Sequence, residues 1–378
     1  MGEAVNVRIG TLLDALFEKE ASDLIVKVGS PPALRLDGQL HALSSWEAMT
    51  AEQTHSLSDE LLSPDHRAQL ESGGTVDFSF EWKDQGRVRG NAFRQRGTIA
   101  IALRAIPTGI PTFSELRLPA ITQKLVELPR GLILLTGPTG AGKSTTQASM
   151  IDWINGARAQ HIITIEDPIE YVHADRNCLV EQREVGVDTT DFADALRAAL
   201  REDPDVMLVG EMRDLESIRI ALNIAETGHL VFATLHTNDT TQALNRIVDV
   251  FPGDQQQQIR VQLAASLQAV IYQQLLPLKA GGRVAAFEVL LGTPAVRALL
   301  RENKSAQLRN VVITSRSEGM QTLEHSMSEL VAEGLVDWEE AVAVSLYPKE
   351  VERAQPGHRT RPAPPPSQPS SWRHPEPV

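Results

Sequence analysis

A glycine-rich segment near the middle of the chain constrains the fold more than any other feature of the sequence. The segment satisfies the P-loop pattern in full and reads Gly137-Pro138-Thr139-Gly140-Ala141-Gly142-Lys143-Ser144. Glycine is needed there because backbone N–H groups must point at phosphate oxygens without obstruction by Cβ atoms. The apolar run 132–135 predicts a buried strand before the loop, and residues 143–154 predict a helix after it. This context favours a phosphate site over a glycine-rich turn that binds nothing.

The requirements of phosphoryl transfer give two residues of this segment specific roles. Lys143 is expected to reach the β- and γ-phosphates of a nucleotide. The Ser144 hydroxyl is expected to join the coordination shell of Mg²⁺. The cofactors predicted from the sequence are therefore ATP and Mg²⁺.

Three further apolar strands are predicted after the P-loop, and each of them ends in polar residues. The runs 162–165, 206–209 and 230–235 lead into Glu166, Glu211 and His236, respectively. Open parallel sheets bind ligands outside the carboxyl ends of their strands, so these side chains are expected to gather beside the P-loop. A single acidic residue after a strand is usually a helix cap or a solvated turn. As a set, the residues favour a functional site.

ATP hydrolysis needs a metal ion, neutralisation of charge and a residue that activates water. Glu211 is the predicted general base, and Glu166 is predicted to polarise water or to hold the metal shell, with Glu170 in support. His229 and His236 flank one strand, so each is a candidate to hydrogen-bond phosphate. The alternative for each histidine is a structural role.

Composition bears on the class of partner and on the compartment. The net charge of −13 lowers the expectation of nucleic-acid binding, because phosphate backbones repel an acidic chain. The single cysteine, Cys178, excludes an internal disulfide and a multi-cysteine zinc site, which favours a reducing, cytoplasmic location. No apolar run approaches eighteen residues, so we expect no membrane-spanning helix.

The hydrophobic pattern changes along the chain and predicts two domains, giving an α/β protein with an N-terminal α+β domain. A helix is expected over 9–17, a hairpin over 34–40 with Asp37-Gly38 at its turn, and further strands over 76–82, 87–93 and 98–103. We assign residues 1–105 to this domain, 106–118 to a linker and 119–350 to a P-loop domain with a mostly parallel sheet. Residues 351–378 are proline-rich and predict a disordered tail, with a docking motif as the alternative.

Four sequence boxes together resemble the secretion ATPase superfamily, and within it the type IV pilus retraction ATPases of the PilT family. Residues 137–145, which add Thr145 to the nucleotide-binding set, look like its Walker A motif. Residues 165–170 are similar to its Asp box, 203–214 to its Walker B motif and 227–237 to its His box. In that Walker B motif the glutamate after the glycine is the catalytic base, which corresponds to Glu211. Residues 21–24 and 31–38 match the N-terminal domain of this branch, and 295–302 resemble its C-terminal element needed for retraction.

The resemblance implies a ring of six subunits, each with a PAS-like N-terminal domain and a RecA-like ATPase domain. Such a ring is expected on the cytoplasmic side of the inner membrane, where it acts on a platform protein at the pilus base to retract the pilus. A large additional N-terminal region and a four-cysteine zinc site would mark an assembly ATPase, and the sequence has neither. Ala141 departs from the usual serine, and Val185 to Thr189 look closer to the accessory retraction ATPase PilU. A paralogous retraction ATPase is therefore a further expected partner.

The N-terminal domain concentrates cations within an acidic chain, at Arg87, Arg89, Arg94, Arg96 and Arg104. Arg87 and Arg89 lie two apart in a strand and so project from one face, and Arg104 closes the next strand. An arginine supplied from outside the P-loop would neutralise charge on the γ-phosphate. Arg89 and Arg104 match family arginines and are the predicted catalytic pair, and the alternative is a solvated sheet face.

Two other functions stay open at this point. A nucleic-acid translocase would use the same ring-forming fold, but it needs basic tracks and stacking aromatics that are scarce here. A nucleotide sensor that does not hydrolyse ATP would usually lack one of Lys143, Ser144, Glu166 and Glu211, and all four are present.

Overall fold

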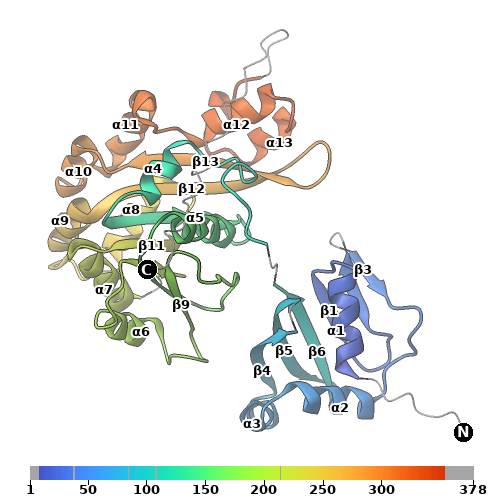
Figure 1. The fold of residues 1–378 in the computed structure, drawn as a ribbon. Helices are drawn as coiled ribbons and strands as arrows, with labels where there is room; N and C mark the ends of the chain where they lie inside the picture. The colour runs from blue at the N-terminus through green and yellow to red at the C-terminus, as the bar shows by residue number, and fades with distance from the viewer. Residues whose placement is uncertain (1–7, 37–38, 84, 107–108, 213, 354–378) are drawn as a thin grey trace, which may run out of the picture. The chain divides into compact units, whose positions relative to one another are not determined.

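The computed structural model describes residues 8–36, 39–83, 85–106, 109–212 and 214–353 (Figure 1). Its contacts divide the chain into two units. The first comprises the chain up to Gly109 with Glu170–Val172, and the second begins at Ile110 and comprises the rest. The turn at 37–38 and most of the predicted tail lie outside the described residues. Among the helices described, none is both long and apolar enough to cross a membrane.

The first unit is an antiparallel sheet of six strands in the order β3-β2-β1-β6-β5-β4. Apolar side chains of its first helix, among them Leu12, Leu13 and Leu16, are fully buried in the core of this unit. Its elements are α1(Ile9–Glu18), β1(Asp23–Val26), β2(Ala33–Leu36), β3(Gln39–Ala42), α2(Ala51–Leu61), α3(Pro64–Gly73), β4(Thr75–Trp82), β5(Gly86–Gln95) and β6(Thr98–Ala105).

Two helices of this unit, α2 and α3, were not predicted from the sequence. The buried face of α2 consists of Thr54, Leu57 and Ser58, which give little hydrophobic periodicity. Local capping defines its start instead, since Thr50 and Gln53 form a reciprocal capping box. In α3, Ser63 caps a helix with proline in its first turn.

The second unit contains a seven-stranded sheet in the order β13-β12-β7-β11-β10-β8-β9, in which only β13 runs antiparallel to its neighbour. This arrangement confirms the predicted mostly parallel sheet. Its elements are α4(Ile121–Val126), β7(Gly131–Thr136), α5(Lys143–Ala157), β8(His161–Glu166), β9(Leu179–Glu184), α6(Phe192–Ala199), β10(Val206–Val209), α7(Leu215–Glu226), β11(Leu230–Leu235), α8(Thr240–Asp249), α9(Gln256–Ser266), β12(Leu267–Pro277), β13(Arg283–Leu291), α10(Pro294–Arg301), α11(Leu308–Thr314), α12(Leu323–Ala332) and α13(Trp338–Val344), with short 3₁₀ turns between the last helices.

Helices cover both faces of this sheet, because its central strands are apolar on both sides. Along β7, Leu132 and Leu134 belong to one core cluster, with residues of α7, α8 and α9. Ile133 and Leu135 belong to a second cluster, with residues of α4 and α5. Both faces of β7 are therefore closed to solvent, which leaves the strand ends as the places where polar chemistry can reach water.

Candidate nucleotide site

The carboxyl ends of four parallel strands meet at one edge of the sheet of the second unit. In the strand register, Thr136 of β7 lies beside Leu235 of β11, and Val209 of β10 lies beside Ile165 of β8. The P-loop begins one residue after Thr136, and His236 begins the segment that follows β11. The P-loop, Glu166, Glu211 and His236 therefore gather at this edge, as predicted, whereas His229 lies at the other end of β11.

The P-loop adopts a backbone that its glycines make accessible. Gly140 and Gly142 have φ angles of 78° and 83°, in the left-handed region that disfavours other residues. Lys143 is only 7% exposed, and its ammonium donates to the carbonyl oxygens of Gly137 at 2.8 Å and Pro138 at 3.0 Å. The lysine therefore folds back over the loop, with its charge satisfied by backbone oxygens.

His236 links this lysine to Glu211. Its Nδ1 lies 3.3 Å from Lys143 Nζ, and its Nε2 lies 3.4 Å from Glu211 Oε2. An ammonium group has no acceptor capacity, so Nδ1 accepts from Lys143 and the ring proton is on Nε2, facing the Glu211 carboxylate. Three predicted residues thus form one continuous polar chain from the P-loop to the end of β10.

Glu166 is oriented by two neighbours at the end of β8. Its carboxylate accepts from Thr164 Oγ1 at 2.7 Å and from Gln182 Nε2 at 3.2 Å. Gly210 allows β10 to come close, since a Cβ atom there would lie 3.1 Å from both the Glu166 Cα and the Ile165 oxygen. Glu170, its predicted support, is exposed. The two strand-end carboxylates, Glu166 and Glu211, thus sit on adjacent strands.

The two candidate histidines lie at opposite ends of β11. His229 precedes β11 and its carbonyl accepts from the N–H of Gly131, at the start of β7. Its Nδ1 contacts the Ile224 oxygen at 3.0 Å, which gives it a structural role at the amino edge of the sheet. Seven residue steps at about 3.3 Å each place it roughly 23 Å from His236 along the strand. Of these two histidines, His236 is the one that lies at the P-loop edge within a subunit.

The two predicted catalytic arginines lie side by side in the first unit. Arg89 of β5 is paired in register with Arg104 of β6, and both are exposed. Arg104 Nε forms an ion pair of 2.8 Å with Asp23, which offsets the repulsion between opposed cations. Among the other cations, Arg87 donates to Ser79 at 2.7 Å, and Arg94 and Arg96 are exposed.

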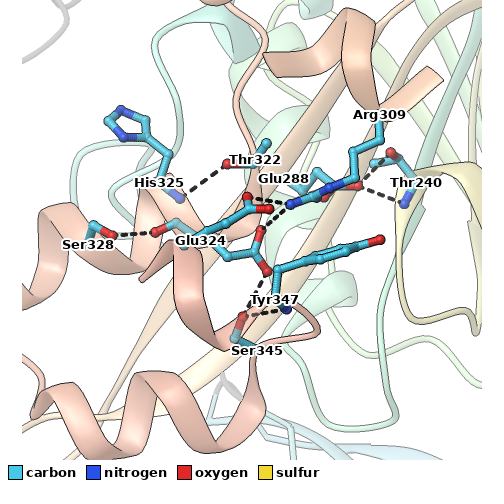
Figure 2. A network of polar contacts seen from close by, with 10 residues as sticks. Thr240, Glu288, Arg309, Thr322, Glu324, His325, Ser328, Ser345 and Tyr347 are labelled. Atoms are coloured by element: carbon cyan, nitrogen blue, oxygen red, sulfur yellow. Dashed lines mark hydrogen bonds and ion pairs between the residues drawn. The ribbon is translucent and has the colours of Figure 1, made fainter. Parts of the chain in front are cut away.

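Two buried polar residues that hold the loops of this site were not predicted from the sequence. Gln273 on β12 donates to the Ala141 oxygen in the P-loop at 2.7 Å. Glu288 on β13 accepts from the Thr240 N–H at 3.0 Å and its hydroxyl at 2.6 Å, at the start of α8 (Figure 2). Both interrupt apolar strands, and that interruption is the signal that would have found them.

Glu288 anchors the segment that follows His236. Burial raises the pKa of Glu288, and the hydrogen bonds from Thr240 oppose that shift. In a separate group nearby, Glu324 of α12 lies 3.4 Å from Arg309, whose guanidinium stacks 3.5 Å from the centre of the Tyr347 ring (Figure 2). Glu288 thus ties α8 to β13, and the Arg309 group ties α11 to α12 and to the segment that follows α13.

Comparison with known proteins places this site in a family. The family model described as type II/IV secretion system protein matches residues 111–343. The type IV pilus retraction ATPase PilT of Pseudomonas aeruginosa is 47% identical over 341 residues, which span 90% of this chain and 99% of that protein. The chain belongs to the type IV pilus retraction ATPase family. It is accordingly an ATP-hydrolysing enzyme of the P-loop class.

Other members of the retraction ATPase family agree with this placement. A crystal structure of the pilus retraction motor PilT with bound ADP matches with a TM-score of 0.86 at 50% identity, covering 91% of this chain and 98% of that one. The type IV pilus ATPase PilU of Pseudomonas aeruginosa is 40% identical over 333 residues, which span 88% of this chain and 87% of PilU. Identity is thus higher to PilT than to PilU. The enzyme class sets aside the non-hydrolysing sensor.

Proposed function

We propose that this ATPase powers the retraction of a type IV pilus. The observation that carries the proposal is the end-to-end similarity to a retraction ATPase, combined with the chain of contacts from Lys143 through His236 to Glu211. The second candidate is an accessory, PilU-like role. The segment Val185 to Thr189 favours this role, but the overall identity to PilU is lower than the identity to PilT.

The P-loop residues fit a nucleoside triphosphate. We assign phosphate binding to residues 137–145, with the buried ammonium of Lys143 as their only lysine. Lys143 is held by two loop carbonyls, and phosphate oxygens are stronger acceptors for the same ammonium. On nucleotide binding, Lys143 would exchange these carbonyls and His236 for the phosphates. His236 is then the residue that senses the exchange.

The residues present also fit Mg²⁺ delivered with the nucleotide. No group of three or more acidic, histidine or cysteine side chains suited to hold a metal occurs in the described part of the chain. Mg²⁺ commonly takes most of its ligands from phosphates and water and needs few from the protein. Ser144 and Glu166 would hold it, and the ion would neutralise charge on the phosphates.

Glu211 is the proposed general base for water attack. Its carboxylate faces Nε2 of His236, which orients it. The carboxylate takes a proton from water while the water oxygen bonds to the γ-phosphorus, and the bond from that phosphorus to the β,γ-bridging oxygen breaks to leave ADP. Arg89 and Arg104 are the proposed source of charge neutralisation from the first unit.

The assembly is proposed from the family resemblance. It comprises six copies of the chain, each with a PAS-like domain over 1–105, a linker over 106–118, an ATPase domain over 119–350 and a tail over 351–378. The ring would act from the cytoplasm on an inner-membrane platform protein, with a paralogous ATPase as a further partner and no nucleic acid.

Two experiments test this function. The purified protein should hydrolyse Mg²⁺-ATP, and Lys143→Ala should abolish nucleotide binding and turnover, whereas Lys124→Ala, an exposed control on α4, should leave both unchanged. In cells, loss of the protein should leave pili assembled but abolish twitching. Cells that lack pili altogether would contradict a role in retraction.

A further inference from the structure

Gln273 contacts three parts of the P-loop region: Gly137 at the start of the loop, Ala141 near its end, and Thr146 in helix α5. On β12 the preceding residue, Tyr272, pairs in register with Thr136, so Gln273 stands at the level of Gly137. Its side chain is 3% exposed. Besides donating to the Ala141 oxygen, it accepts from the Thr146 hydroxyl at 2.8 Å through Oε1. Both ends of a buried amide are therefore used, one by the loop and one by α5.

Gly137 and Gly142, the first and last glycines of the loop, also pack closely against Gln273. A Cβ atom on Gly137 would lie 2.3 Å from the Gln273 carbonyl oxygen, and one on Gly142 would lie 2.9 Å from its Nε2. Neither distance is tolerated by a real Cβ atom. At position 137 the requirement for glycine thus arises partly from the packing of the Gln273 backbone, in addition to the approach of phosphate. At position 142 the Gln273 amide could shift, and the positive φ of 83° is what disfavours other residues.

The hydrogen bond to Ala141 fixes the orientation of one peptide group. In a planar trans peptide the C=O of one residue and the N–H of the next point in opposite directions. Because Gln273 holds the Ala141 oxygen toward β12, the N–H of Gly142 is turned away from β12. Backbone N–H groups of the loop are the donors that a phosphate requires, so the orientation of this peptide bears directly on nucleotide affinity.

We propose that Gln273 is a positioning residue that holds the Ala141–Gly142 peptide in the orientation that accepts the nucleotide phosphates. The inference rests on the proposed phosphate-binding role of the loop. Glutamine suits this position because its amide offers a donor to a carbonyl and an acceptor to a hydroxyl at the same time. Gln273 does not touch the reacting atoms, and it acts through the loop.

The test compares two adjacent glutamines of one strand. Gln273→Met keeps the length and apolar volume of the side chain but leaves the buried Ala141 oxygen without its donor. Because that peptide is then free to rotate, KM for ATP should rise about 10-fold to 100-fold, while kcat at saturating ATP stays within about 3-fold, since Glu211 and Glu166 are untouched. Gln274→Met is the matched control, because neighbouring strand residues face opposite sides and Gln274 bonds Tyr272 and Leu275 instead.

Thr146→Val provides a second, milder variant that removes only the hydroxyl contact of Gln273. It should raise KM about 3-fold, in the same direction as Gln273→Met, and it decides the question if Gln273→Met does not fold. Thermal unfolding without nucleotide reports folding independently. Normal KM in a folded Gln273→Met variant, or in Thr146→Val should Gln273→Met not fold, would overturn the inference. Failure of the wild-type protein to turn over ATP in the same assay would instead overturn the proposed function.

Discussion

The two sheets of this chain bury their strands in different ways. Every residue of β7, β10 and β11 in the parallel sheet is buried, whereas β5 in the antiparallel sheet alternates between buried and partly or fully exposed positions. Along these three parallel strands, polar side chains with access to water are therefore confined to the strand ends. In the antiparallel sheet they spread along an exposed face. A strand-end glutamate is thus informative about function in the second unit, while an exposed arginine in the first unit is not.

The largest expected effect tests whether the exposed face of the antiparallel sheet contributes to catalysis. If Arg89 or Arg104 neutralises the γ-phosphate, replacing either with alanine should lower kcat by on the order of 10³-fold or more with nucleotide binding retained. Loss of the exposed Arg104–Asp23 ion pair should cost stability only about 0–1 kcal/mol. Steady-state turnover and ADP binding are measured on the same preparations.

Arg94→Ala is the control for these variants. Arg94 is exposed on the same strand as Arg89 but five positions away, so it projects from the opposite face. It should keep normal turnover. Normal turnover in Arg89→Ala and Arg104→Ala, as in Arg94→Ala, would assign Arg89 and Arg104 to a solvated face.

A smaller effect concerns the pH dependence of stability in the second unit, where His173 is buried. Burial lowers the pKa of His173 to about 4. Between pH 6.5 and about 4 the unfolded chain binds a proton that the folded chain refuses, so the free energy of unfolding falls as the pH falls. We expect His173→Gln to remove about 2–3 kcal/mol of the loss in unfolding free energy between pH 7 and pH 4.

Denaturant unfolding at several pH values measures this difference, with His41→Gln as control. His41 is exposed on β3 of the first unit, so its replacement should leave the pH dependence unchanged. If wild type and His173→Gln lose stability in parallel on acidification, His173 does not carry the effect.

The smallest effect concerns the C-terminal segment of the chain. Deletion of residues 357–378 should leave ATPase activity and assembly unchanged, because their proline-rich composition cannot bury a core. Turnover and size-exclusion chromatography provide the check. A ring that dissociates after the deletion would show that the tail holds subunits together.

The success of prediction from the sequence also depended on how the strands are buried. The P-loop, Glu166, Glu211 and His236 were located because buried parallel strands place their carboxyl ends together. His229 and His236 could not be told apart from the sequence, because residues that flank one strand lie at opposite edges of the sheet. Gln273 and Glu288 interrupt apolar strands, but their partners Ala141 and Thr240 are 132 and 48 residues away in sequence, so the contacts themselves could not be predicted. Long-range polar pairs of this kind leave no local periodicity to recognise.

The central claim is that the strand-end carboxylate Glu211 performs the chemistry beside the P-loop. Glu211→Gln keeps the shape of the side chain but cannot accept a proton from water. Single-turnover hydrolysis of Mg²⁺-ATP, with nucleotide binding measured in parallel, tests this directly. We predict that binding is retained and that the hydrolysis rate falls about 10²- to 10⁴-fold. Hydrolysis at the wild-type rate would contradict the account and transfer the role of base to Glu166.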